Sequence, residues 1–223
     1  MQRLTFDTLI NAANARGLLC MGALHPRPGE IATGTDVGGT LVLIGAGADF
    51  WPVFRAAPEA SDGLPDPIDR WSERVVGEFA QEFGAAAHFP FGGPPYSPFI
   101  DWAKRSGRAF PSPTGMLVHE SVGLMISYRG ALHLPDLLDI PPTVAASPCD
   151  SCDDQPCVTA CPVGALGASA PYDLVACHAY LDVAAGRECM SAGCHVRRAC
   201  PVSAGAARTH DQSAHHMKAF HPS

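Results

Sequence analysis

Eight of the nine cysteines in this 223-residue chain lie between positions 149 and 200, and no other feature restricts its fold as strongly. The first run has the spacing C-x2-C-x4-C-x3-C and ends in Cys161-Pro162. A lone Cys177 precedes the second run, which has the spacing C-x4-C-x5-C and ends in Cys200-Pro201. The same Cys-Pro ending therefore closes both runs.

The sequence outside these runs predicts a protein of a reducing compartment. Residues 1–7 lack the apolar core of a signal peptide. The longest apolar run, 41–48, is far shorter than the roughly 20 residues that a membrane helix needs. We therefore expect a soluble, cytoplasmic protein without a membrane partner. In that compartment, clustered cysteines indicate metal binding rather than disulfides.

The duplicated Cys-Pro ending is typical of proteins that hold two [4Fe–4S] clusters. Each cluster needs four thiolates, and the fourth cysteine of each run ligates the cluster of the other run. The proline that follows fixes φ and ends the loop. On this logic, one cluster is predicted to bind Cys149, Cys152, Cys157 and Cys200, and the other Cys161, Cys177, Cys189 and Cys194.

Structural zinc is the alternative for these cysteines, because an all-cysteine zinc site also uses paired thiolates. Zinc ribbons usually show two CxxC knuckles rather than two interleaved runs with Cys-Pro endings. Two spacings, x4 before Cys157 and x5 before Cys200, are longer than in the usual ferredoxin run. This difference weakens the assignment of individual ligands more than it weakens the prediction of two clusters. The remaining Cys20 is expected to be a small buried apolar residue.

The formal charge of -7 restricts the partners. Duplex nucleic acid is not expected as a partner, because it requires clustered Lys and Arg and the chain has no such stripe. An acidic chain suits a basic redox partner, which it attracts by electrostatic steering.

The hydrophobic pattern outside the cysteine runs changes between helical and strand periods. Residues 5–16 and 66–83 repeat apolar side chains at helical spacing, and Gly17 stands where a helix cap is expected. The proline-rich stretch 135–148 predicts an extended connection. The expected elements are helices over 5–16, 66–83 and 99–106, and strands over 17–24, 40–47, 116–118, 122–128 and 131–134, the last two joined by a tight turn at Arg129-Gly130.

These elements predict an α+β sheet domain over residues 1–145, followed by a small ferredoxin-like domain with two clusters over 146–207. Residues 208–223 form a polar tail that is expected to be loosely structured. A solvated tail is preferred to a metal site there, although the segment contains His210, His215, His216 and His221.

Residues 116–201 resemble the end of epoxyqueuosine reductase and, more loosely, the cobalamin-dependent reductive dehalogenases. The matching segments are 123–132, 149–162 and 171–181. In those enzymes a nitroreductase-like domain holds a base-off cobalamin, and two [4Fe–4S] clusters deliver electrons to its cobalt. The first part of the chain is also similar to cblC-type cobalamin-processing proteins, at 40–44, 66–69 and 119–134.

The resemblance implies a corrinoid site in the first domain. The loop 91–98 is rich in glycine, which permits close approach to a flat macrocycle. This loop has no acidic proton donor, which argues against epoxide reduction, and 119–121 lacks the basic residue that serves thiol chemistry in cblC-type proteins. The residues predicted to contact the corrinoid are Gly92, Gly93, Tyr96, Ser127 and Tyr128. Tyr96 is also the candidate proton donor, and the alternative is a tyrosine packed at a domain boundary.

The first predicted function is an iron–sulfur oxidoreductase that takes electrons from a redox donor protein or a small reductant and reduces a bound corrinoid. The alternative is a ferredoxin-type electron carrier with a docking domain and no corrinoid. A bound flavin is the third interpretation, although 45–47 lacks the third glycine of a dinucleotide fingerprint. Three histidines, His88, His119 and His133, are expected to be structural rather than cobalt ligands.

Overall fold

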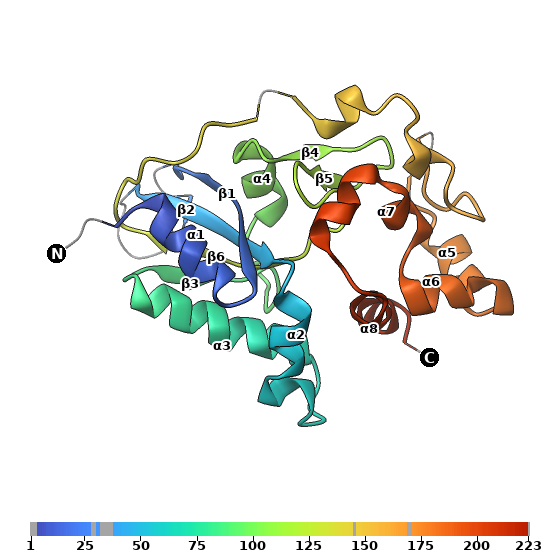
Figure 1. Ribbon diagram of the computed structural model, residues 1–223, viewed down its shortest axis with the longest axis horizontal. Coiled ribbons are helices and arrows are strands. Elements are labelled where there is room, and N and C mark those ends of the chain that lie inside the picture. The colour runs from blue at the N-terminus through green and yellow to red at the C-terminus, as the bar shows by residue number, and fades with distance from the viewer. Residues whose placement is uncertain (1–3, 28–29, 32–37, 145, 169–170, 223) are drawn as a thin grey trace. The chain divides into compact units, whose positions relative to one another are not determined.

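The computed structural model describes residues 4–27, 30–31, 38–144, 146–168 and 171–222 (Figure 1). The chain divides into two compact units. The first consists of Met1–Arg108 and Ser127–Val144, and the second of Ala109–Ile126 and Ala145–Ser223. The segment 109–126, which the sequence pattern placed in a domain over residues 1–145, thus belongs to the unit that contains the cysteine runs.

The first unit combines helices with one sheet. Its elements are α1 (Phe6–Asn14), β1 (Leu18–Leu24), β2 (Thr40–Ala46), α2 (Phe50–Arg55), η1 (Pro58–Ala60), α3 (Pro67–Glu82), β3 (Ala86–His88), α4 (Phe99–Arg105) and β6 (Tyr128–Leu134). The sheet is antiparallel, with the strand order β1-β2-β6-β3. The helices predicted over 5–16, 66–83 and 99–106 are confirmed, as are the strands over 17–24 and 40–47.

The core of this unit lies between the sheet and helices α1, α2 and α3. Val42 and Ile44 of β2 contribute to this core together with Trp71 of α3. Leu41 and Leu43 alternate with them along β2, so they point to the opposite face, and both are fully buried. The unbroken apolar run in β2 follows from burial on both faces.

Local signals set the ends of the helices. The Thr5 hydroxyl accepts a hydrogen bond from the Thr8 amide at 3.3 Å and caps α1. Past the end of α1, Gly17 has a φ of 71°, and its amide donates to the Asn14 carbonyl at 3.0 Å. Helix α3 begins at Pro67, whose fixed φ suits the first helical position.

Two predictions for residues 122–134 are wrong. The predicted strand over 122–128 is instead a turn followed by irregular chain, and a single strand, β6, passes through Arg129-Gly130 without a turn. Gly130 lies opposite Ile44, and a Cβ there would be 2.8 Å from Val76 Cγ1 of α3. The glycine therefore allows close packing of α3 on the sheet and does not mark a hairpin.

The second unit is built mostly from short elements, of which the last, α8, has 11 residues. They are β4 (Ala109–Pro111), β5 (Leu117–His119), η2 (Pro148–Ser151), η3 (Pro156–Val158), α5 (Leu174–Leu181), η4 (Ala184–Gly186), α6 (Arg187–Ala192), α7 (His195–Ala199), η5 (Pro201–Ala206) and α8 (His210–Phe220). Strands β4 and β5 pair antiparallel, with Ala109 opposite His119. The apolar core gathers Val118, Leu124 and Val196 around two of the cysteines.

The expectation of a loosely structured tail over 208–223 is also wrong. Residues 210–220 form helix α8, whose first turn is capped by the Thr209 hydroxyl. The helix packs against α6 (Figure 1) and buries Gln212 and Ser213. Its buried face is polar and small, so hydrophobic periodicity did not reveal it. A Cβ at Gly193 would be 2.9 Å from the Cβ of Ser213.

Helices interleaved with a small antiparallel sheet make this an α+β protein, as predicted. In the part of the chain that the structure describes, no helix combines the length and the apolar character needed to cross a membrane.

Replacement of Gly17 by alanine is expected to lower the free energy of unfolding by about 1–2 kcal/mol, because the residue has a positive φ. The added Cβ would also be 2.9 Å from the Asp49 carbonyl oxygen. The matched control is Gly77→Ala within α3, where a Cβ meets nothing within 4 Å. It is expected to raise stability by about 0.5–1 kcal/mol.

Denaturant titration followed by tryptophan fluorescence checks this prediction, because Trp51, Trp71 and Trp102 all lie in the first unit. Equal midpoints for the two variants would contradict the packing described for Gly17.

Candidate metal centre

Four of the cysteines are held by short 3₁₀ segments of the second unit. Cys149 lies in η2 and Cys152 directly after it, Cys157 lies in η3, and Cys200 stands between α7 and η5. The Ser147 hydroxyl caps η2 by accepting a hydrogen bond from the Cys149 amide at 3.2 Å. Such short, capped turns allow neighbouring thiols to point in one direction.

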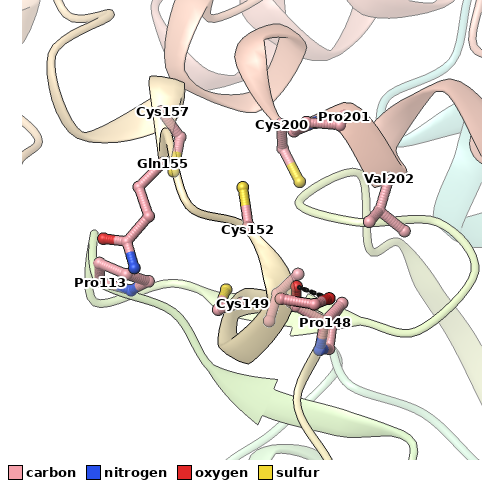
Figure 2. Close-up of a pocket in the computed structure, with 11 residues that line it drawn as sticks. Pro113, Pro148, Cys149, Cys152, Gln155, Cys157, Cys200, Pro201 and Val202 are labelled. Atoms are coloured by element: carbon pink, nitrogen blue, oxygen red, sulfur yellow. Dashed lines mark hydrogen bonds between the residues drawn. The ribbon is translucent and has the colours of Figure 1, made fainter.

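These four side chains line one cavity of about 230 Å³. Figure 2 shows their Sγ atoms turned toward the space between them. Most of the remaining lining is apolar and comes from prolines and valines, namely Pro113, Val118, Pro148, Pro201 and Val202. Ser151 and Gln155 complete the wall. The volume corresponds to roughly eight water molecules, which is more than a single metal ion fills.

The electrostatic environment of this first cysteine set reflects the proximity of its thiols. Burial raises the pKa of Cys157, and the neighbouring thiols of Cys200, Cys149 and Cys152 act in the same direction. Burial likewise raises the pKa of Cys149, where the Asp150 carboxylate adds to the effect. Binding of a metal to these thiols would therefore release protons, since the ligand form is the thiolate.

The other four cysteines form a second set. Cys161 ends the first run, Cys177 lies in α5, Cys189 lies in α6, and Cys194 precedes α7. Burial raises the pKa of Cys177, and the thiols of Cys194 and Cys161 act in the same direction. Cys194 and Cys177 likewise raise the pKa of Cys189, which burial raises most. The thiols that act on one another's pKa thus fall into the two groups of four that the interleaved pattern defines, and their role as ligands stays a prediction.

Besides Arg198, which lowers the pKa of Cys189, two side chains act on the second set that the sequence pattern did not assign to it. The Tyr172 hydroxyl donates a hydrogen bond to the Cys177 sulfur at 3.2 Å, which lowers the pKa of that thiol. The Arg197 guanidinium is partly buried, and burial lowers its pKa while Cys194 and Tyr172 oppose the shift. The only sequence signal for either residue was its position close to a cysteine.

The segment 109–126 supports the first cysteine set although it has no cysteine. Its hairpin supplies Pro113 and Val118 to the cavity wall. The Leu124 amide donates to the Ser203 hydroxyl at 3.0 Å, and its carbonyl accepts from Arg197. These bonds join the turn after β5 to η5 and α7, the two elements that flank Cys200.

The cysteines around the cavity can also be examined for a site that holds one metal ion. In the described ranges of the chain, no group of three or more His, Cys, Asp or Glu side chains is arranged to hold a single metal ion. A zinc ion draws its thiolates to about 2.3 Å from one point. The four sulfurs of the first set line the cavity without forming such a single-ion site among the described residues.

The predicted corrinoid residues fall into two groups, both in the first unit. Gly92, Gly93 and Tyr96 lie in the loop before α4, where the Tyr96 side chain is 66% exposed. Ser127 and Tyr128 lie at the start of β6. In the described part of the chain, no hydrogen bond or ring contact joins the two groups.

The local space differs between the two loop glycines. A Cβ at Gly92 would meet nothing within 4 Å, whereas a Cβ at Gly93 would be 2.5 Å from the Tyr96 ring. Tyr128 is mostly buried against Phe99, and burial raises its pKa. Its hydroxyl has no hydrogen-bond partner among the described residues.

Comparison of the chain with protein-family models, curated proteins and solved structures gives no match. The site therefore has to be interpreted from its own residues.

The remaining sequence candidates have local roles. His133 Nε2 is 2.9 Å from the Gly38 carbonyl, and His119 Nδ1 is 3.0 Å from the Ser121 hydroxyl. His88 packs edge-on against Trp102. Cys20 packs against the core of the first unit, and burial raises its pKa to about 12. None of these residues is in the cavity wall described above.

Replacement of Ser203 by alanine is expected to destabilise the second unit by about 1–3 kcal/mol, because the buried Leu124 amide loses its acceptor. The control is Ser191→Ala on the exposed side of α6, which is expected to stay within about 0.5 kcal/mol of the parent chain. Amide hydrogen exchange of Leu124 measures the effect directly. Unchanged protection of that amide in Ser203→Ala would contradict the support assigned to segment 109–126.

Proposed function

We propose that this chain is an iron–sulfur electron-transfer protein whose second unit holds two [4Fe–4S] clusters in a ferredoxin-like arrangement. We further propose that it acts as an oxidoreductase, reducing a corrinoid that a nitroreductase-like first unit binds. One observation carries the proposal: four cysteines from both runs surround a single cavity (Figure 2). A bound [4Fe–4S] cluster supplies one-electron transfer at a potential that its surroundings set.

The donor set and the cavity both fit such a cluster. Cys149, Cys152 and Cys157 reach the cavity from one loop, and Cys200 reaches it from the end of the other run. This is the three-plus-one arrangement of two-cluster ferredoxins. The prolines and valines make the wall largely apolar, and apolar surroundings are one of the factors that tune an iron–sulfur centre.

Support for a corrinoid comes from the resemblance and from two features of the first unit. Gly92 leaves open space beside the backbone, and Tyr96 next to it is exposed. The Tyr128 hydroxyl is buried without a partner among the described residues and would gain one from a polar ligand group. Gly93 fits less well, since the Tyr96 ring fills the space beside it.

A ferredoxin-type carrier without a corrinoid is the second candidate. It keeps both cysteine sets and gives the first unit a docking role only. The formal charge of -7 favours it, because an acidic carrier attracts basic redox partners. In either case the electrons come from a redox donor protein or a small reductant.

Replacement of Cys157 by alanine is expected to halve the iron content of protein purified without oxygen, because the first cluster loses a ligand. Cys194→Ala is expected to do the same through the second cluster. Cys20→Ala is the control and should keep the full iron content, since Cys20 lies in the first unit. Iron and acid-labile sulfide are measured per chain. Parent levels of iron in either ligand variant would disprove that ligand assignment, and stoichiometric zinc in place of iron would disprove the clusters.

Added hydroxocobalamin is expected to bind and to show corrinoid bands of a base-off form, followed by those of reduced cobalt after dithionite. Visible spectra of the anaerobic holoprotein measure this directly. The control is Tyr128→Phe, which is expected to keep the cluster absorption but to bind the corrinoid more weakly. Bleaching of the clusters with no retained or perturbed corrinoid would leave the carrier function in its place.

A further inference from the structure

Arg197 of α7 has an unusual position for a charged residue. Its guanidinium is partly buried and donates a hydrogen bond to the Leu124 carbonyl. Across the described residues no carboxylate forms an ion pair with it. The adjacent Arg198, by contrast, pairs with Glu188 at 2.7 Å.

A cation removed from water is strongly destabilising unless an opposite charge compensates it. The titratable groups that act on Arg197 are the Cys194 thiol and the Tyr172 phenol. Cys194 belongs to the second cysteine set, and Tyr172 donates a hydrogen bond to another member of that set, Cys177. Cys194 is the N-cap of α7 and lies three residues before Arg197, so the thiolates of the second set, together with what they bind, are the groups placed to compensate this charge.

The first cysteine set has the opposite environment. The Asp150 carboxylate acts on Cys149, and Asp153 and Asp154 are exposed on the same loop. The charged groups that act on Cys149 and Cys157 are other thiols and Asp150, with no arginine among them. The two sets thus differ in charge: the Asp150 carboxylate acts on the first, whereas Arg197, Arg198 and the Tyr172 hydroxyl act on the second.

We propose that Arg197 is the internal counter-charge of the second cysteine set and, with the Tyr172 hydroxyl, gives the cluster bound there the higher reduction potential of the two. The inference rests on the proposed function. Reduction adds one negative charge, so a nearby cation and a hydrogen bond to sulfur stabilise the reduced form more than the oxidised form. Asp150 near the first set has the opposite effect.

This difference sets a direction for electron flow within the second unit. With clusters bound, a low-potential one-electron donor would reduce the one held by the first set, and one electron would then pass to the one held by the second set. The first is oxidised and the second reduced by the same electron, and no bond forms or breaks. Electrons therefore collect at the end of the module that contains Cys161, Cys177, Cys189 and Cys194.

The test is a redox titration of the anaerobic holoprotein followed by electron paramagnetic resonance. The couple that disappears in Cys194→Ala is assigned to the second set, and in the parent chain it should be the higher one. Arg197→Gln is expected to lower the reduced-to-oxidised ratio of that couple at least tenfold at a fixed potential, which is about 59 mV for one electron. Arg197→Lys keeps the charge and should restore most of the ratio.

Two further variants separate the electrostatic effect from a structural one. Tyr172→Phe removes only a hydroxyl from a side chain that is 40% exposed, and it should shift the same couple in the same direction by a smaller factor. Arg187→Gln removes an equal charge from an exposed position of α6 and should shift neither couple. If Arg197→Gln does not fold, Tyr172→Phe decides the test.

Iron content is measured before each titration, so that two failures can be told apart. A parent chain without clusters contradicts the proposed function. If the parent chain has full iron, two results contradict this inference alone. One is a lower potential at the second set, and the other is an unchanged couple of the second set in both Arg197→Gln and Tyr172→Phe.

Discussion

The convergence of cysteine thiols is the main constraint on the second unit. One of its buried apolar clusters has Cys157 and Cys200 among its members. Buried thiols placed close together raise one another's pKa, so a set of four resists ionisation until a cation binds. Under the proposed function, metal binding and folding are expected to be coupled in this unit, as they are in small metal-binding domains.

The first cysteine set is assembled from parts that are distant in sequence. Cys149 to Cys157 come from one loop and Cys200 from the end of α7, while the segment 109–126 supplies part of the wall. Hydrogen bonds from Leu124 and to its carbonyl connect that segment to η5 and α7. A change in the turn after β5 would therefore reach the cavity through Cys200, although the turn contains no thiol.

Charge gives the two sets different surroundings and so different proposed roles. A carboxylate of the first loop acts on one set, and a partly buried arginine faces the other. Arg197 would be an unfavourable residue in a metal-free module, since no carboxylate compensates it among the described residues. Its position is understandable if the thiolates beside it carry a permanent negative charge, which is the state that bound clusters maintain.

The sequence alone determined the α+β class and helices α1, α3 and α4, because these follow from local periodicity, while its grouping of the cysteines into ligand sets stays a prediction. It did not reveal that 109–126 belongs to the second unit, that α8 packs through Gln212 and Ser213, or that β6 runs straight through Gly130. A glycine at position 130 is compatible with a turn and equally with a close contact between elements. The Val76 side chain next to it shows that the close contact is the reason. Likewise, Tyr172 and Arg197 differ from other tyrosines and arginines only by the sulfurs they approach, and such contacts exist only once the chain has folded.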